Sequence, residues 1–260
     1  MMPGEIKIRH CDTLAEYREC VQLELSTWGE TITVPSAIFT VAHHTGGQIL
    51  GAFDGATLVG FTLALAGMRD GKAFLHSHMT AVLPEYQNRG IGRRLKLFQR
   101  EDALRRGISL IEWTFDPLEL KNAHFNLVRL GAIARRYIED CYGLTESPVH
   151  AGLPTDRLVA EWWLDSDRVR SILEGKPLPL NSARHIGYPS NIGEIKTKNR
   201  AAGARYQAEA REKFLQMFSR GFVATYIETR DSTTDYVLEP AASLAGLELL
   251  PSSAHGEASE

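Results

Sequence analysis

Apolar and polar residues alternate at residues 6–9, and apolar-rich runs bounded by turn signals occur between residues 48 and 82, which predicts strands. Three such runs are separated by two Asp-Gly pairs, a turn signal typical of hairpins. The predicted strands cover residues 6–9, 48–53, 57–66 and 73–82. The last three form an antiparallel meander. Two helices are expected between the first strand and this meander. One is opened by a capping box of Thr13 and Glu16, and the other begins at Pro35 and runs to His44.

The apolar spacing changes after Pro84 from the strand period to the helix period. Helices are predicted at 90–106 and 120–130, with a strand at 108–115 between them and further strands at 132–142 and 158–164. A strand–helix–strand crossover in this order predicts a parallel pair within an otherwise antiparallel sheet.

The last third of the chain has a different composition. Residues 176–193 are rich in Pro, Gly, Asn and Ser, which indicates a linker or long loop, whereas 199–220 is an amphipathic helix. A strand at 222–229, with 236–238 as its partner, follows. We expect one domain over 1–165, an extension over 166–240 and a disordered tail over 241–260. The extension would lengthen the sheet, cover the acceptor side or form a homodimer contact.

Composition and charge indicate the cellular compartment and the classes of binding partner. The chain has 260 residues and a formal net charge of −3, so no global basic field favours nucleic acid or an anionic membrane. No signal-peptide-like segment opens it, and no run of about 18 apolar residues predicts a membrane span. Cys11, Cys20 and Cys141 are odd in number and form no CxxC pair, which is typical of free thiols in a reducing compartment. We therefore expect a cytoplasmic protein.

The most informative segment is the loop before the helix at 90–106, with the sequence Gln87-Asn88-Arg89-Gly90-Ile91-Gly92. A helix N-terminus attracts anions, and two residues without a Cβ let a phosphate approach the backbone. Arg89, Arg93 and Arg94 add positive charge. The loop lacks the GK[ST] of a Walker loop and the third glycine of GxGxxG. It is either a phosphate cradle or a tight strand-to-helix turn with solvated arginines.

This segment resembles the GNAT superfamily of acyl-CoA-dependent N-acyltransferases, whose pyrophosphate loop has the form Q/R-x-x-G-x-G/A. The order of elements over about the first 165 residues is similar too. Within the superfamily, segments such as Thr114 to Leu118 and Asn122 to Asn126 resemble a branch of predicted acetyltransferases. The resemblance implies an α/β (α+β) fold with a mixed, mostly antiparallel sheet. A central parallel pair would splay around the coenzyme, helices would cover both faces, and a C-terminal helix and strand would extend the fold.

The resemblance also implies a cofactor, acetyl-CoA or another acyl-CoA, used as co-substrate without a metal. The backbone of the strand end would pair with the pantetheine arm, and the loop would hold the pyrophosphate. The arginines could also meet the 3′-phosphate. The expected coenzyme-binding residues are Met79, Ala81, Val82, Gln87, Asn88, Arg89, Gly90, Ile91, Gly92, Arg93 and Arg94.

Candidate bases lie on two strands. His76 and His78 are two residues apart on the strand before the loop, and the alternation predicts one face for them and Thr80. A histidine titrates near neutral pH, so either could be a general base, a structural histidine, or a metal ligand if a third ligand were present. Glu112 on the next strand is either a base acting through water or a solvent-facing carboxylate.

The acid that protonates the leaving thiolate is harder to place. Many members of the superfamily use a tyrosine for this step, and the register set by Leu130 and Gly131 puts Leu127 at that position. Asn126 beside it could donate a hydrogen bond to the thiolate or carbonyl, but an amide is no acid.

These residues predict an acyltransferase that moves an acetyl or short acyl group to a small-molecule amine by direct transfer. Nothing next to Cys141 marks it as an activated nucleophile. Two alternatives remain open: a non-catalytic acyl-CoA-binding or regulatory module, favoured by the missing tyrosine, and a protein N-acetyltransferase.

Overall fold

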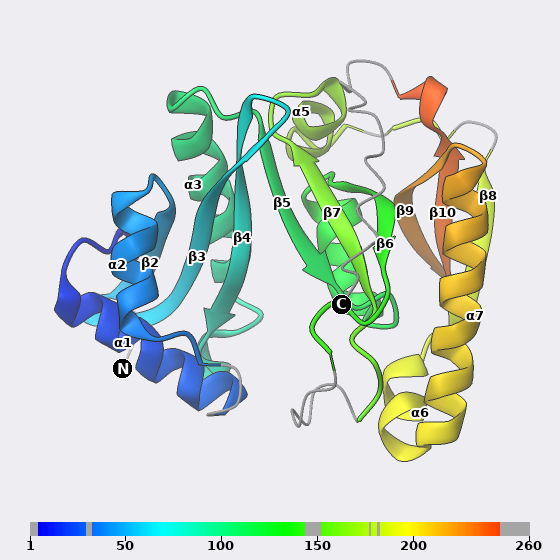
Figure 1. Ribbon diagram of the computed structural model, residues 1–260, viewed down its shortest axis with the longest axis horizontal. Coiled ribbons are helices and arrows are strands. Elements are labelled where there is room, and N and C mark those ends of the chain that lie inside the picture. Colours follow the sequence, from blue (N-terminus) through cyan, green and yellow to red (C-terminus); the bar gives the residue numbers. More distant parts are fainter. Residues whose placement is uncertain (1–4, 30–32, 144–151, 177, 181–182, 245–260) are drawn as a thin grey trace, which may run out of the picture.

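The structure is a computed structural model that describes residues 5–29, 33–143, 152–176, 178–180 and 183–244. In this part of the chain, strands join into one sheet in the order β1-β2-β3-β4-β5-β7-β6-β9-β10-β8 (Figure 1). The strands are β1 (Ile6–His10), β2 (Gln48–Asp54), β3 (Thr57–Arg69), β4 (Lys72–Val82), β5 (Leu110–Phe115), β6 (Ile133–Ile138), β7 (Arg157–Trp163), β8 (Arg184–Pro189), β9 (Phe222–Arg230) and β10 (Thr233–Pro240). The helices are α1 (Leu14–Trp28), α2 (Ser36–His44), α3 (Ile91–Arg105), α4 (Leu120–His124), α5 (Asp167–Leu173), α6 (Ile192–Lys198) and α7 (Arg200–Ser219).

The predicted meander is confirmed, and helices cover both of its faces. Ile49 packs with residues of α1 and α2, whereas its neighbour Leu50 packs with Ile91 and Leu95 of α3. Because successive strand residues point to opposite faces, α1 and α2 lie on one side of β2 and β3, and α3 lies on the other. Each face therefore buries its own apolar cluster.

The sheet is mixed, as predicted, because one strand pair is parallel. β4 and β5 pair in parallel only through Leu75 with Ile111 and His76 with Glu112. Beyond His76, β4 keeps its pairing with β3, and β5 keeps its antiparallel pairing with β7. The two strands therefore form a fork that opens in the chain direction, which separates the two halves of the sheet in Figure 1.

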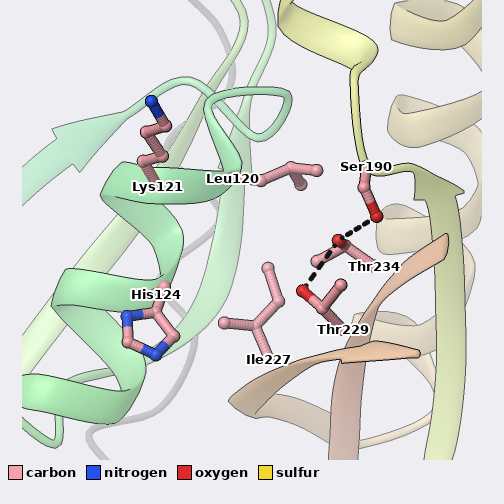
Figure 2. A pocket seen from close by; sticks show the side chains of 7 residues that line it. All are labelled: Leu120, Lys121, His124, Ser190, Ile227, Thr229 and Thr234. Carbon is pink, nitrogen blue, oxygen red and sulfur yellow. Dashed lines mark hydrogen bonds between the residues drawn. The ribbon is translucent and has the colours of Figure 1, made fainter. Parts of the chain in front are cut away.

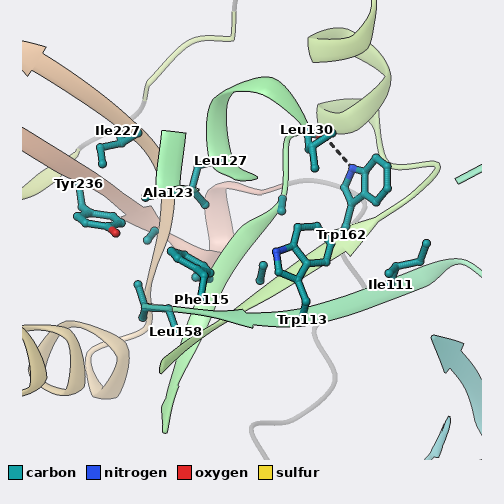
Figure 3. Packing of buried hydrophobic residues seen from close by; sticks show 14 of the residues in the cluster. Ile111, Trp113, Phe115, Ala123, Leu127, Leu130, Leu158, Trp162, Ile227 and Tyr236 are labelled. Carbon is teal, nitrogen blue, oxygen red and sulfur yellow. Dashed lines mark hydrogen bonds between the residues drawn. The ribbon is translucent and has the colours of Figure 1, made fainter. Parts of the chain in front are cut away.

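The C-terminal segment extends the sheet and shares the largest apolar core. β9 and β10 form a hairpin, and β8 pairs with β10 at the sheet edge. Tyr236, Ile227 and Phe214 belong to the same buried cluster as Phe115 and Leu127, as Figure 3 shows for four of the five. The segment after residue 165 is therefore packed into the body of the protein.

Several predicted elements need correction. Residues 176–193 are not simply a linker, because β8 and the start of α6 lie within them. The strand was not predicted because its composition is polar and contains Gly and Pro, and only Ile186 and Tyr188 are buried apolar residues. The short helix α5, capped by Ser166, was not predicted. The helix predicted at 120–130 divides into α4 and a π-helical turn over Phe125–Arg129.

The predicted tail lies mostly outside the description. Ala241–Ser243 form a 3-10 turn, and residues 245–260 lie outside the described residues. In the described part, no helix combines the length and apolarity needed to cross a bilayer.

Candidate active site

The glycine loop connects β4 to α3 and is shaped by local contacts. Pro84–Tyr86 form a 3-10 turn, and the Gln87 Nε2 donates to the Val82 carbonyl at 2.9 Å, which fixes the end of β4. Asn88 and Gly90 both adopt left-handed conformations, with φ of 59° and 76°. Gly90 is the residue that precedes α3, so the glycine permits the sharp entry into the helix.

The start of α3 is open to an anion. No side chain caps this helix, and its first helical hydrogen bond runs from the Arg94 N–H to the Gly90 carbonyl at 3.0 Å. The N–H groups of Ile91, Gly92 and Arg93 therefore precede the helical ladder. A Cβ placed on Gly90 or Gly92 would meet no atom within 4 Å. The loop thus leaves room above exposed amide groups, as the phosphate-cradle interpretation requires.

The three arginines near the loop have different surroundings. Arg89 is exposed, and its guanidinium carbon lies 5.1 Å from the ring centroid of Tyr86. Arg93 is half-buried, and its Nε has no hydrogen-bond partner among the described residues. Arg94 donates to the Ile6 carbonyl of β1 at 2.6 Å. Arg89 and Arg93 are therefore the arginines that are free to turn towards a phosphate.

The fork exposes the edge of β4 directly before this loop. From Ser77 to Val82, β4 has no partner on its β5 side among the described strands. Met79 is half-buried against the α1 and α2 cluster, and Ala81 is buried within it. Their side chains anchor the strand while its backbone edge stays available to an extended arm.

The two histidines lie at the fork but do not share their face with Thr80. The β3–β4 register shifts so that Leu63 pairs with Met79 and Ala64 pairs with Ser77, which leaves His78 as a bulge residue. The rings of His76 and His78 are 6.3 Å apart between centroids. The bulge breaks the alternation of side chains along β4. Thr80 therefore points to the opposite side from the two histidines, where its hydroxyl forms a hydrogen bond with the Thr62 hydroxyl at 2.8 Å. The prediction that Thr80 shares a face with His76 and His78 is wrong.

Both histidines have a lowered pKa. Desolvation lowers the pKa of His78 below its ordinary value. Burial also lowers the pKa of His76, and the nearby positive charges of His78 and Lys96 lower it further. Each ring is therefore neutral at neutral pH, which is the protonation state that a general base needs.

Glu112 is not solvent-facing, because its carboxylate is held in a buried ion network. Arg69 binds it through two hydrogen bonds of 2.6 and 2.8 Å, and Arg136 binds Oε1 as well. Arg136 and Arg135 also bind Glu161, the β7 partner of Glu112. The oxygens of Glu112 are thus occupied by guanidinium groups, and its position beside His76 places this network at the base of the fork.

Asn126 lies on the other face of the sheet, in the π-helical turn. Its Oδ1 accepts a hydrogen bond from the Trp113 indole at 3.2 Å, and its buried Nδ2 has no partner among the described residues. Leu127 is fully buried in the apolar core beside Leu130. Figure 3 shows this packing, with Trp162 donating to the Leu130 carbonyl at 2.7 Å.

Lys96 is a residue that sequence reasoning missed. It lies on the buried face of α3 with Leu95 and Gln99, and it is only 5% exposed. Its Nζ donates to the Ser77 hydroxyl at 2.6 Å and lies 4.2 Å from the ring centroid of Trp113. The available signal was a lysine among the core-facing positions of an amphipathic helix.

Two cavities lie away from the fork. One of about 310 Å³ separates α4 from the C-terminal strands, where hydrogen bonds link the hydroxyls of Ser190, Thr234 and Thr229 (Figure 2). Lys121 and His124 line its other wall. The second, of about 430 Å³, lies beside α1. Neither is lined by a predicted site residue.

The cysteines are free thiols, as predicted. Cys11 and Cys20 are buried, and Cys141 is half-buried. Burial raises the pKa of Cys141, which keeps it protonated and weakly nucleophilic. Among the described residues, no group of three His, Cys, Asp or Glu side chains is arranged to hold a metal ion.

Solved structures with a similar arrangement are distant in sequence. The ribosomal-protein-S18-alanine N-acetyltransferase of Escherichia coli is 15% identical, with a TM-score of 0.48 over 60% of this chain and 92% of that one. NAA60 of Arabidopsis thaliana, in complex with a bisubstrate analogue, is 15% identical, with a TM-score of 0.49 over 61% and 98%. An aminoglycoside acetyltransferase from an uncultured soil metagenomic sample is 15% identical, with a TM-score of 0.42 over 46% and 84%. These likenesses identify no substrate.

Sequence comparison gives a family. No curated protein matches the chain. A sequence model of the acetyltransferase (GNAT) family matches residues 12–131, which run from the start of α1 through the fork and the glycine loop to the end of the π-helical turn. This segment, 120 of the 260 residues, therefore matches the acetyltransferase (GNAT) family.

Proposed function

We propose that the protein transfers an acetyl or another short acyl group from acyl-CoA to the amine of a small molecule, by direct transfer in a ternary complex. The observation that carries this proposal is the continuity between the open α3 N-terminus and the unpaired edge of β4. Together they offer amide groups for a pyrophosphate and a strand edge for an extended arm that ends at the fork.

The residues fit the coenzyme in two places. Gly90, Ile91 and Gly92 would hold the pyrophosphate, with Arg89 and Arg93 adding charge, because no atom occupies the space above the two glycines. The backbone of Met79, Ala81 and Val82 would pair with the pantetheine arm. Gln87 and Asn88 shape the loop, and Arg94 contributes by fixing α3 against β1. When bound, the coenzyme supplies the activated acyl group as a thioester.

The base would come from the histidine pair. His76 and His78 lie where the fork closes, and their lowered pKa keeps them able to accept a proton from an ammonium group at neutral pH. Glu112 is a weaker candidate, because Arg69 and Arg136 occupy its oxygens. We propose instead that Glu112 holds Arg69 and Arg136 in place at the base of the fork.

The Asn126 amide would contribute a hydrogen bond on the opposite side of the fork. Its Nδ2 is a buried donor without an acceptor among the described residues, and such a group is costly unless a ligand satisfies it. A thioester or its anionic intermediate would provide that acceptor.

A non-catalytic acyl-CoA-binding module is the second candidate, because Leu127 replaces the tyrosine that the family commonly uses. A protein N-acetyltransferase is the third, and it differs only in the acceptor.

The experiment is acetyl-CoA binding followed by an amine screen. Acetyl-CoA at a hundredfold excess over Kd should raise the free energy of unfolding by about 2.7 kcal/mol. A panel of small-molecule amines is then compared with a panel of peptides that have free N-termini. We expect the small-molecule amines to accelerate CoA release. Binding without acceleration by any amine would favour the binding module, and acceleration only by peptides would favour the protein acetyltransferase. Absence of acetyl-CoA binding by the folded protein would refute all three.

A further inference from the structure

Lys96 carries a buried positive charge that no carboxylate balances. Its Nζ contacts the Ser77 hydroxyl at 2.6 Å, the Gln99 Oε1 at 3.2 Å and the face of Trp113. All three partners are neutral, and no ion pair of Lys96 occurs in the described part of the chain. Burying an ammonium without a counter-ion costs several kcal/mol even after relaxation, so this lysine lowers stability where an apolar residue would raise it.

The position of this charge coincides with the apex of the fork. Ser77 directly follows His76, the last residue of β4 that pairs with β5. Trp113 directly follows Glu112, the last residue of β5 that pairs with β4. The Lys96 ammonium therefore bridges the two strands at the point where they begin to separate, which is where an arm running along β4 from the glycine loop must end.

An unpaired buried donor lies beside the same indole. The Trp113 indole that carries Lys96 on its face also donates to Asn126, whose Nδ2 is buried and unpaired among the described residues. The Lys96 ammonium and the unpaired Asn126 amide therefore flank one indole. Such an arrangement is complementary to a group that becomes anionic at the apex.

We propose that Lys96 is the general acid that protonates the departing CoA thiolate, in the role for which other family members use the tyrosine that Leu127 replaces here. This inference rests on the proposed acyl transfer. After a histidine removes one proton from the substrate ammonium and releases it to solvent, the amine nitrogen forms a bond to the thioester carbon. Collapse of the intermediate breaks the C–S bond, and the electron pair goes to sulfur. Lys96 gives one N–H proton to that sulfur, and the new amide nitrogen loses its extra proton to the base.

The protonation equilibrium of Lys96 suits this role. Burial lowers the pKa of Lys96 to about 7, which lies near neutral pH, whereas an ordinary thiol titrates at about 8.5. The proton therefore moves downhill from nitrogen to sulfur. A pKa near the working pH is also the value at which a general acid is most effective.

The charged groups around Lys96 favour the same division of roles. His76 of β4 lies close enough to Lys96 for the Lys96 charge to lower the pKa of the histidine. From β5, Glu112 is bound by Arg69 and Arg136. Protonated Lys96 thus favours neutral His76, so the acid and the base reach their active forms in the same pH range.

The first test separates binding from turnover in Lys96→Met. The probes are acetyl-CoA and hydroxylamine, a small nucleophile that needs no dedicated acceptor pocket. We expect the Kd for acetyl-CoA to change less than about threefold, while hydroxylamine-dependent CoA release falls about 100-fold, the lower end of what a general acid contributes. Lys198→Met, which removes an exposed lysine of α6, is the matched control and should match the wild type.

The second test follows the alkaline limb of the pH–rate profile, because an acid must be protonated to act. Wild-type turnover should fall as pH rises past the pKa of Lys96, and this limb should vanish in Lys96→Met. Ser77→Ala removes an acceptor from the ammonium and should move the limb to lower pH. Gln99→Glu places a carboxylate beside it and should move the limb to higher pH. A lysine with a purely structural role would leave the limb unmoved.

The outcomes distinguish the two proposals. If the wild type binds acetyl-CoA and Lys96→Met releases CoA at the wild-type rate, the acid assignment is overturned and the acyltransferase proposal stands. If the folded wild type binds no acetyl-CoA, both are overturned. Should Lys96→Met fail to fold, the opposite shifts of Ser77→Ala and Gln99→Glu decide the matter, and a limb that stays in place for both overturns the assignment.

Discussion

Arg211 of α7 forms a bidentate ion pair with Asp156, at 3.0 Å for both hydrogen bonds. The Asp156 side chain is completely buried and also accepts from the Tyr137 hydroxyl at 2.8 Å. This contact connects the long C-terminal helix to the residue that precedes β7. A charge pair of this kind holds two distant parts of the chain in one arrangement, because breaking it leaves a carboxylate buried without its counter-ion.

Arg211→Met should therefore lower the free energy of unfolding by about 3 kcal/mol, the lower end of the range for a broken buried pair, because Arg211 is partly exposed. Urea unfolding gives the value. Arg205→Met on the same helix removes an exposed arginine whose nearest carboxylate, Glu209, is 3.9 Å away. It should cost less than about 0.5 kcal/mol. Equal losses in the two variants would contradict a special role for Asp156.

A chain ending after residue 165 should not fold to a stable monomer. The cut removes Phe214, Tyr236 and Leu238 from the apolar cluster that contains Phe115 and Leu127, and it exposes β6 as a new sheet edge. Exposed apolar surface and an unpaired edge both promote association. Size-exclusion chromatography and dye binding to exposed apolar surface measure the effect. A monomeric fragment with a cooperative unfolding transition would show that residues 1–165 are an independent domain.

Gly92→Glu should abolish acetyl-CoA binding without unfolding the protein. A side chain has open space at Gly92, and a carboxylate in the first turn of α3 favours the helix. The same carboxylate would occupy the position of the pyrophosphate and repel its charge. We therefore expect Kd to rise at least about 100-fold, a loss of about 2.7 kcal/mol in binding free energy. Calorimetry measures the affinity. Gly193→Glu in the first turn of α6, where a side chain also has open space, is the matched control. Unchanged affinity in Gly92→Glu would count against the cradle.

The acid limb of kcat/KM should have its midpoint below about 6.5, the ordinary pKa of histidine. A base works in its neutral form, and the surroundings lower the pKa of both His76 and His78, so activity should be lost only as pH falls past these lowered values. His78→Ala should reduce turnover more than affinity. Of His76→Ala and His78→Ala, the variant that loses the acid limb identifies the base. His185→Gln in β8 is the control. A midpoint above 6.5 would exclude both histidines.

Lys96→Met should stabilise the protein most at pH 7 and below. The folded pKa of Lys96 is about 7, and the unfolded value is near 10.5. Between these values the unfolded chain binds the extra proton, so wild-type stability gains about 1.4 kcal/mol per pH unit as pH rises above 7. The advantage of Lys96→Met should shrink accordingly between pH 7 and pH 9. Urea unfolding at several pH values measures it, and a constant difference would contradict the buried charge.

Local sequence rules predicted the elements whose cause is local. The capping box formed as expected, with the Glu16 N–H donating to the Thr13 hydroxyl and the Thr13 N–H donating to Glu16, both at 3.2 Å. The meander followed from apolar-rich runs and Asp-Gly turns, and the glycine loop adopts the strand-to-helix turn that its two glycines indicated.

The site could be predicted only where it depends on the backbone. The glycine loop, the proposed coenzyme site, is one continuous segment, so its residue types and spacing carry the signal. The predicted face of Thr80 was wrong, because it is reversed by the bulge at His78, and that bulge arises from the pairing of β4 with β3. β8 was missed, because its partner β10 lies more than forty residues later and the strand is stabilised by that pairing.

The amino-acid sequence by itself determined the glycine turn before α3, the order of most strands and helices, and the absence of a tyrosine at Leu127. Tertiary structure alone decided that Lys96 has no counter-ion among the described residues, that Glu112 is held by two arginines, and that both lie at the fork. The physical reason is that protonation and charge balance depend on neighbours within a few ångströms, and folding draws those neighbours from strands and helices that are far apart along the chain.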